Sequence, residues 1–366
     1  MDHGNTDKIY RAIDLFAGIG GIRLGFQQAF EDKIKFVFSN EIDDDACKTY
    51  EANFGENPKG DITKVNPDDI PDFDILLGGF PCQAFSIAGR KMGFEDTRGT
   101  LFFYLANIIK KKKPEAFLLE NVKNLMSHDK GKTFEVIKNT LEFDLKYNIH
   151  YKILNAKDFG VPQNRERIFI VGFKRNLKFQ FPEPLNIQVK LEDILEQNVD
   201  ESYYVSQQYL WGMKKHRARH EALGHGFGYE VIPRDGIANA IVCGGMGKER
   251  NLVYDKILEN CWKKEGDDIQ LRNNEGIRKM TAREWARLQG FPDTYQFPVS
   301  MTKQYKQLGN SVAVPVIRAI ALQMKKSLQE HIIIKSTKQT TLIPFDAPND
   351  LMNLSQILTK KEKINP

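Results

Sequence analysis

Residues 10–25, YRAIDLFAGIGGIRLG, decide the fold class of this chain. A short apolar run is followed by a turn containing Gly18, Gly20 and Gly21, and then by residues with helical periodicity. A glycine-rich turn between a first strand and a first helix is a place where α/β proteins bind a nucleoside or a phosphate. The turn is not the dinucleotide fingerprint G-x-G-x-x-G, because Arg23 stands where the third glycine is required.

Two carboxylates farther along the chain also suit a nucleoside. Residues 35–41, KFVFSNE, read as a strand that ends in Glu41. Glu41 follows the glycine turn by about 20 residues, the offset at which an acidic side chain can hold ribose hydroxyls. Asp61, in a loop of sequence GDI, can accept a hydrogen bond from the exocyclic amine of an adenine. Each carboxylate also has a structural alternative, since acidic residues cap helices and turns.

A single cysteine in a glycine-rich loop is a candidate for chemistry. Residues 78–86, GGFPCQAFS, follow a predicted buried strand at residues 73–77 and place Cys82 directly after Pro81. Open α/β proteins carry their reactive groups at the carboxyl edge of the sheet, so this strand delivers a thiol to that edge. A buried structural cysteine is the alternative for Cys82 considered alone.

Charged side chains are predicted at the same edge. A strand at residues 114–119 is followed by Glu120, and Arg165 and Arg167 alternate along the start of a later strand. Residues two apart on a strand point the same way, so both arginines can face one cleft. The alternatives are a capping role for Glu120 and a surface pairing of the arginines with Glu166. Because strands and helices alternate up to this point, the sequence predicts a doubly wound, mostly parallel α/β sheet.

The pattern changes after residue 175. Residues 176–275 lose the alternation and gain glycine, aromatic and mixed polar content, which we interpret as a smaller, irregular, β-rich domain. Residues 237–254 combine small residues with cations and an amide, as a loop that enters a DNA groove requires, although a merely flexible loop has the same composition. The candidate DNA contacts in this segment are Gly244, Gly245, Lys248, Arg250 and Asn251. His216 and His220 lie four apart without an acidic partner pattern, so we expect no metal site.

Regular structure is predicted again near the C-terminus. Residues 280–290, MTAREWARLQG, read as an amphipathic helix, and Thr281 with Glu284 forms a capping box. Residues 305–315, YKQLGNSVAVP, lead into a final helix that we expect to end near Glu330. The remaining residues are mostly polar and contain no motif.

Composition fits a globular protein that can tolerate a polyanionic partner. The chain has 366 residues, of which 41% are hydrophobic and 28% charged, and a net charge of +5. The four cysteines are far apart and form no CxxC pattern, which disfavours a zinc cluster. The sequence has no apolar run long enough to span a membrane and no apolar signal core. We therefore expect a cytoplasmic protein without membrane association, and a monomer.

Taken together, the motifs resemble those of the C5-cytosine DNA methyltransferase family, in particular the small bacterial enzymes of restriction–modification systems. They occur in the family's order and cover roughly residues 10–175 and 276–330. The matching segments are DLFAGIGG, NE at Asn40-Glu41, GDI, GGFPCQAFS, ENV at residues 120–122, QNRER, TAREWARLQGFP and LGNSVAVP. The resemblance implies a Rossmann-like fold with a catalytic domain (residues 1–182), a target-recognition domain (183–300), a return to the catalytic domain (301–330) and a C-terminal extension (331–366).

The resemblance also implies ligands and residue roles. The implied methyl donor is S-adenosylmethionine, which leaves as S-adenosylhomocysteine, and the implied partner is double-stranded DNA. The implied cofactor-binding residues are Phe16, Gly18, Gly20, Gly21, Glu41, Ile42, Asp61, Ile62, Pro81, Leu101, Asn310 and Ser311. The implied catalytic residues are Cys82, Glu120, Arg165 and Arg167. Ser86 and Arg98 join the candidate DNA contacts.

In the implied reaction, Cys82 attacks C6 of a cytosine that has been flipped out of the duplex, which makes C5 nucleophilic enough to take the methyl group. Glu120 engages N3 and the exocyclic amine, and burial favours its protonated form. An arginine at O2 fixes the ring and favours the thiolate of Cys82. One departure is Ala240, where the family often has a threonine before an aliphatic residue. Loss of one such hydrogen bond costs about 0.5–1.5 kcal/mol.

Three other functions agree with parts of the sequence. A tRNA cytosine methyltransferase of the same superfamily usually carries a Cys-Phe-Thr signature, which is absent here. A catalytically silent DNA-binding relative is disfavoured because Cys82, Glu120 and both arginines are present. A nicotinamide-dependent oxidoreductase is disfavoured by Arg23 in the glycine turn.

Overall fold

A six-stranded sheet forms the centre of the computed structural model, which describes residues 8–81, 101–225, 228–244, 248–255 and 273–340. The strand order is β2-β1-β3-β4-β7-β5. The strands are β1 (Tyr10–Leu15), β2 (Ile34–Asn40), β3 (Ile75–Gly79), β4 (Ala116–Val122), β5 (Asn148–Asn155) and β7 (Glu166–Phe173). The first four strands pair in parallel, whereas β7 runs antiparallel to both β4 and β5. The prediction of a mostly parallel sheet is confirmed, with β7 reversed.

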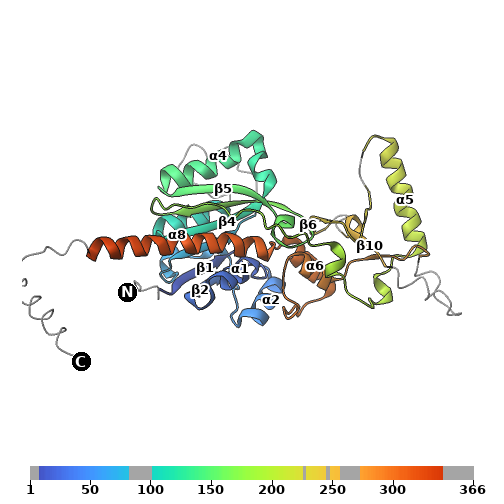
Figure 1. Cartoon of the computed structure of the whole chain (residues 1–366), viewed down its shortest axis with the longest axis horizontal. Coiled ribbons are helices and arrows are strands. Elements are labelled where there is room, and N and C mark those ends of the chain that lie inside the picture. Colours follow the sequence, from blue (N-terminus) through green and yellow to red (C-terminus); the bar gives the residue numbers. More distant parts are fainter. Residues whose placement is uncertain (1–7, 82–100, 226–227, 245–247, 256–272, 341–366) are drawn as a thin grey trace, which may run out of the picture.

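Helices cover both faces of this sheet. One apolar cluster joins Leu118 of β4 to Phe26 and Ile317, which belong to α1 (Gly21–Phe30) and α8 (Val314–Thr340). A second cluster joins Leu119, the next residue of β4, to helices on the opposite face. These helices are α3 (Leu101–Lys112) and α4 (Lys132–Asn139). Neighbouring residues of one strand therefore face two different cores, which is why the strands read as continuous apolar runs. In Figure 1, α4 lies above β5 at the top of the view and α1 lies beside β1 in its lower half.

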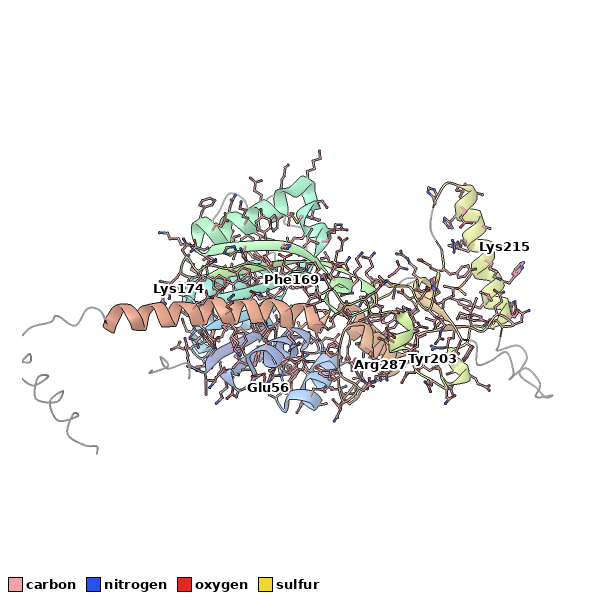
Figure 2. All side chains as sticks on the ribbon, in the orientation of Figure 1. Glu56, Phe169, Lys174, Tyr203, Lys215 and Arg287 are labelled. Carbon is pink, nitrogen blue, oxygen red and sulfur yellow. The ribbon has the colours of Figure 1, made fainter. Side chains whose placement is uncertain are left out.

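The second region contains short strands and one long helix. A three-stranded sheet contains β8 (Val231–Ile232), β10 (Leu252–Tyr254) and β11 (Ile277–Lys279), and a separate pair contains β6 (Gln163–Asn164) and β9 (Ala238–Asn239). Helix α5 (Gln207–Ala222) lies at the far end from the large sheet (Figure 1). In Figure 2, Lys215 lies on this outlying helix, whereas Phe169 lies within the large sheet.

The two regions share an apolar core. One cluster contains Ile19 from the glycine turn together with Ile232, Val253 and Trp285. Trp285 belongs to α6 (Ala282–Leu288), which begins with the predicted capping box and is followed by α7 (Met301–Asn310). Apolar packing that is continuous across both regions holds the second region against the end of the large sheet.

The C-terminal elements differ from their sequence predictions in extent. The segment that we expected to lead into the final helix is itself helical as far as Asn310, the last residue of α7. The final helix, α8, continues past Glu330 to Thr340. Within the described residues, no helix combines the length and the apolar character that a membrane span requires.

Candidate functional site

A cavity of about 570 Å³ lies where the parallel strands end. Its wall is formed by residues that follow β1 and β2, by the last residues of β3 and β4, by the start of β7 and by the α7–α8 junction. The lining includes most of the residues that the sequence singles out: Phe16, Gly18, Gly21, Glu41, Ile42, Asp61, Ile62, Pro81, Leu101, Glu120, Arg165, Arg167, Asn310 and Ser311. The expected edge of the sheet thus gathers these residues from distant parts of the sequence.

Glu41 ties the end of β2 to the glycine turn. One of its carboxylate oxygens accepts a hydrogen bond from the backbone N–H of Gly18 at 2.7 Å. The other accepts from the N–H groups of Ile42 and Asp43, each at 2.8 Å. A carboxylate has about four lone-pair sites, so three backbone donors fix its position and leave capacity for a hydroxyl of a ligand.

Apolar and capping side chains complete this half of the cavity. Phe16, which is half-buried, and Ile42, which is 62% exposed, both line the cavity. Ile62 is buried. Asp61 caps the short helix that follows it, since one carboxylate oxygen accepts from the N–H of Thr63 at 3.0 Å and from its hydroxyl at 2.7 Å. The capping role of Asp61 is therefore real, and the residue still lines the cavity.

The glycines of the turn are required by backbone geometry and by close neighbours. Gly18 and Gly20 have positive φ values of 55° and 79°. A Cβ at Gly20 would lie 2.2 Å from the ring of Phe54, and one at Gly21 would lie 2.8 Å from the hydroxyl of Ser311. Gly20 does not line the cavity but permits the turn, whereas Gly21 lets α1 approach the α7–α8 junction.

The opposite half of the cavity contains a buried ion pair. Nε of Arg167 lies 3.1 Å from Oε1 of Glu120, and both side chains are largely buried. Burial raises the pKa of Glu120 above its usual value, and the charges of Arg167 and Arg165 oppose this rise. Gly79 faces Glu120 from the neighbouring strand, where a Cβ would lie 3.4 Å from Oε2. The cavity therefore holds a buried carboxyl group with a raised pKa beside a cation, and a group perturbed in this way is a candidate for acid–base chemistry.

The two arginines line the same cavity but have different partners. The guanidinium of Arg165 donates to the carbonyl of Ile241 at 2.6 Å, to that of Gly309 at 3.1 Å and to that of Ser311. The side chain is buried, and burial lowers its pKa. Arg165 is thus bound to three backbone carbonyls, whereas Arg167 pairs with Glu120.

Cys82 lies outside the described residues, as do Ser86, Arg98 and Gly245. The described chain stops at Pro81, which lines the cavity directly before the cysteine. Asn121 holds the backbone just before Pro81 in place, since its side-chain amide donates to the carbonyl of Phe80 at 2.8 Å.

Comparisons with known proteins agree with this geometry. The family model of the C-5 cytosine-specific DNA methylases matches residues 10–326. The chain belongs to this family. The type II methyltransferase M.HpaII of Haemophilus parainfluenzae is 55% identical over 88% of this chain and 91% of its own length. M.HhaI of Haemophilus parahaemolyticus is 42% identical over 87% of this chain and 95% of its own length.

Solved structures support the same fold. The Entamoeba histolytica methyltransferase EhMeth gives a TM-score of 0.67 at 19% identity, covering 90% of this chain and 99% of its own. Spodoptera frugiperda DNMT2 gives a TM-score of 0.65 at 22% identity, covering 89% of this chain and 99% of its own. The Rossmann-like methyltransferase fold is confirmed, and the sequence matches identify the protein as a DNA (cytosine-5)-methyltransferase.

The predicted DNA-contacting segment of this methylase divides into exposed and buried residues. Gly244 and Arg250 are exposed. Lys248 is half-buried, with its ammonium group 3.8 Å from the centroid of the Tyr305 ring. Asn251 is only 1% exposed, and its Oδ1 accepts from the backbone N–H of Asn239 at 2.8 Å. The DNA contact of Asn251 stays a prediction, and in this structure its buried side chain stabilises the interior of the region.

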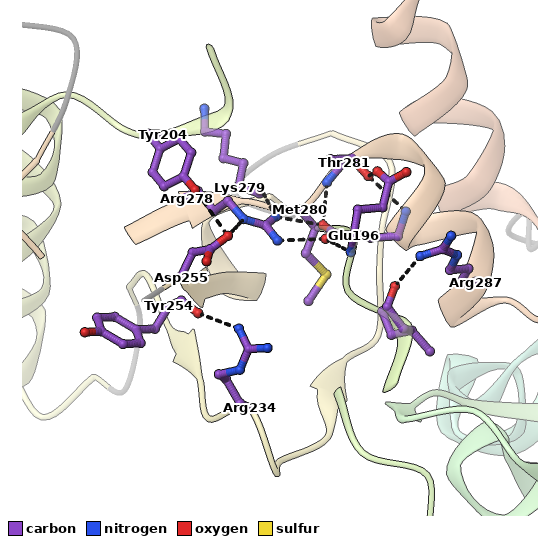
Figure 3. Close-up of polar contacts among 12 residues, drawn as sticks. Glu196, Tyr204, Arg234, Tyr254, Asp255, Arg278, Lys279, Met280, Thr281 and Arg287 are labelled. Atoms are coloured by element: carbon purple, nitrogen blue, oxygen red, sulfur yellow. Dashed lines mark hydrogen bonds and ion pairs between the residues drawn. The ribbon is translucent and has the colours of Figure 1, made fainter. Parts of the chain in front are cut away.

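A buried polar cluster, absent from the predicted site, joins β11 of the second region to α6 (Figure 3). Arg278 of β11 donates to Asp255 at 3.1 Å and forms a bidentate pair with Glu284, the capping-box residue of α6. The hydroxyl of Tyr204 donates to the same Asp255 at 3.2 Å. The sequence contains one usable signal for this cluster, the Thr281–Glu284 capping box, but gives no indication that Asp255 and Arg278 join it.

Proposed function

We propose that this methyltransferase takes the methyl group from S-adenosylmethionine bound in the cavity and transfers it to C5 of a cytosine flipped out of double-stranded DNA. The observation that carries the proposal is that one cavity is lined both by Gly18 and Glu41 and by Glu120 and Arg167. The first pair suits a nucleoside, and the second suits a pyrimidine ring. A donor and an acceptor base bound in a common cavity would have their reacting atoms close together.

The residues of the first half fit an adenosyl cofactor. Glu41 has acceptor capacity for ribose hydroxyls, and Ile42 offers an exposed apolar surface to a flat ring. Asn310 and Ser311 also line the cavity, and the methionine part would lie beside them. When bound, the cofactor supplies an electrophilic methyl group on a sulfonium.

The residues of the second half fit an activated cytosine. The Cys82 thiolate adds to C6, and C5 then takes the methyl group. A general base removes the C5 proton, and the thiolate leaves C6 by elimination. Glu120 donates a hydrogen bond or a proton to N3 as negative charge develops on the ring, and its raised pKa favours the protonated form that this role needs. Arg167 holds Glu120 in place through their ion pair.

Relatives named as type II methyltransferases support a role in a type II restriction–modification system. In this proposal residues 183–300 read the DNA target, and the protein acts as a monomer. Arg250, which is exposed, is the described cation of the recognition segment best placed for a phosphate.

The decisive experiment measures methylation in cells that express the protein. Bisulfite sequencing of their plasmid DNA should show 5-methylcytosine in one short sequence context. A Cys82→Ala variant should leave the plasmid unmethylated while purified variant protein still binds S-adenosylhomocysteine in calorimetry.

Two outcomes would contradict the proposal in different ways. If soluble protein is present and no sequence context contains 5-methylcytosine, the assignment of cytosine in DNA as the substrate is contradicted. Methylation by Cys82→Ala at the wild-type level would contradict the proposed covalent step. It would not contradict the assigned fold or cofactor.

A further inference from the structure

We infer that Cys243, contributed by the recognition region, is a positioning residue that orients Asn310 for the amino-acid end of the cofactor. The thiol of Cys243 donates to Oδ1 of Asn310, with 2.9 Å between Sγ and the oxygen. Both residues line the cavity, and both are exposed to it. The inference rests on the proposed binding of S-adenosylmethionine in this cavity.

The position of Cys243 is fixed by the backbone around it. A Cβ at Gly309 would lie 2.5 Å from the backbone nitrogen of Cys243 and 2.7 Å from the carbonyl carbon of Val242, so only glycine allows the two segments to touch there. Arg165 fastens the same junction, since it donates to the carbonyls of Ile241 and Gly309. These contacts hold the backbone of Cys243 in place, and the thiol is therefore positioned next to Asn310.

The chemistry of the contact selects one orientation of the Asn310 amide. A thiol is a weak donor, and an amide oxygen accepts from it better than an amide nitrogen can. With Oδ1 held by Cys243, the Nδ2 group points away from the thiol. It makes no hydrogen bond within the part of the chain that the structure describes, which leaves its two N–H donors for a ligand. The cofactor end that accepts such donors is the carboxylate of its methionine part, and a hydrogen bond to a charged acceptor is stronger than a neutral one.

The contact between Cys243 and Asn310 connects the predicted DNA-contacting segment to the proposed cofactor site. Cys243 directly precedes Gly244, which belongs to the predicted DNA-contacting segment. A displacement of that segment would move the thiol and release the Asn310 amide. Cys243 thus gives the recognition region a direct influence on the affinity for the cofactor.

The test compares two ligands by calorimetry with the full-length protein in the absence of DNA. S-adenosylhomocysteine carries the amino-acid end, whereas methylthioadenosine has the same adenosine and thioether without it. We expect Cys243→Ala to weaken S-adenosylhomocysteine binding about 3- to 10-fold, the range of one neutral hydrogen bond. Methylthioadenosine binding should change less than about 2-fold, since it has no carboxylate to lose.

Two variants separate positioning from general damage. Cys243→Ser keeps a donor and should restore most of the S-adenosylhomocysteine affinity. In an Asn310→Ala background, Cys243→Ala should add no further loss, because the two residues act as one unit.

The outcomes distinguish this inference from the proposed function. Equal weakening of both ligands by Cys243→Ala, or equal effects of the alanine and serine variants, would overturn the orienting role. Failure of the wild-type protein to bind either ligand would instead overturn the proposed cofactor site.

Discussion

Arg278 and Glu284 form a bidentate ion pair in which both side chains are completely buried, with Nη1–Oε2 at 2.9 Å and Nη2–Oε1 at 2.8 Å. The same carboxylate accepts from the backbone N–H groups of Thr281 and Glu196, each at 2.8 Å. Glu284 is therefore both the capping residue of α6 and the partner of Arg278 in β11. The pair holds β11 to α6, whose Trp285 belongs to the apolar core shared with Ile19 of the glycine turn.

Removal of one partner should strongly destabilise the protein. We expect Arg278→Met to lower the free energy of unfolding by about 3–5 kcal/mol, because it removes the cation that pairs with the buried carboxylates of Asp255 and Glu284. Arg217→Met provides the control, since Arg217 pairs with Glu221 on the exposed surface of α5 and such pairs contribute about 0–1 kcal/mol. Urea denaturation measures both. If the two variants lose similar amounts of unfolding free energy, the buried ion pair contributes no more to stability than the exposed pair does.

The role of Gly18 in ligand binding can be tested with Gly55 as a control, because the two glycines have similar backbone conformations. Gly18 and Gly55 both have positive φ values, 55° and 72°, and a Cβ at either would meet no atom within 4 Å. Alanine should therefore cost each position about 1–2 kcal/mol of stability through backbone strain. Only Gly18 lines the cavity, so only Gly18→Ala should weaken S-adenosylhomocysteine binding, by about tenfold or more. Calorimetry decides, and equal affinities of the two variants would show that the methyl group does not enter the ligand's space.

Asp14 gives a prediction for the pH dependence of stability. It lies in β1 at 1% exposure, and the hydroxyl of Tyr50 contacts one of its oxygens at 3.4 Å. Burial raises the pKa of Asp14 to about 8 despite the nearby charge of Arg23. The folded state then holds a proton that the unfolded chain has released, so stability falls as pH rises from about 4 to about 8.

Asp14→Asn removes this titration and should flatten the fall over that range. Denaturation in urea at pH 5, 7 and 8.5 measures the difference between variant and wild type, which should shift in favour of the variant as pH increases. A difference that stays constant with pH would show that Asp14 titrates at the same pH in the folded and unfolded states.

Glu120 should control the pH dependence of methyl transfer. Because burial raises its pKa, the protonated form persists to higher pH than for an ordinary glutamate and is lost as pH rises through the folded-state value. The single-turnover rate should fall on that alkaline side if Glu120 delivers the proton to N3. Glu120→Gln should lower the rate by about 10²–10⁴-fold and remove this limb of the profile. A glutamine variant with the wild-type profile would assign the titration to another group.

The sequence predicts the large sheet and the cavity well because both depend on local signals. Strand ends, glycine turns and a capping box have short patterns, and parallel strands then bring their ends to one edge. It could not predict the different contacts of Arg165 and Arg167, because strand alternation states only that the two side chains point the same way. The partners of Arg165 are carbonyls near residues 241 and 309–311, and no local pattern records contacts over such separations.

Arg250 and Asn251 are adjacent in sequence, but their substitutions should affect different properties, DNA binding for Arg250 and stability for Asn251. Arg250 is exposed in the recognition segment, so Arg250→Ala should weaken binding to duplex DNA and reduce the slope of log K against log salt by about one. Asn251 is buried and accepts from the N–H of Asn239, so Asn251→Ala should instead lower the unfolding free energy by about 1–3 kcal/mol. Fluorescence anisotropy at several salt concentrations and urea denaturation measure the two quantities. A lower salt slope for Asn251→Ala with unchanged stability would restore the DNA-contacting role that the sequence suggests, since a buried structural amide cannot produce that combination.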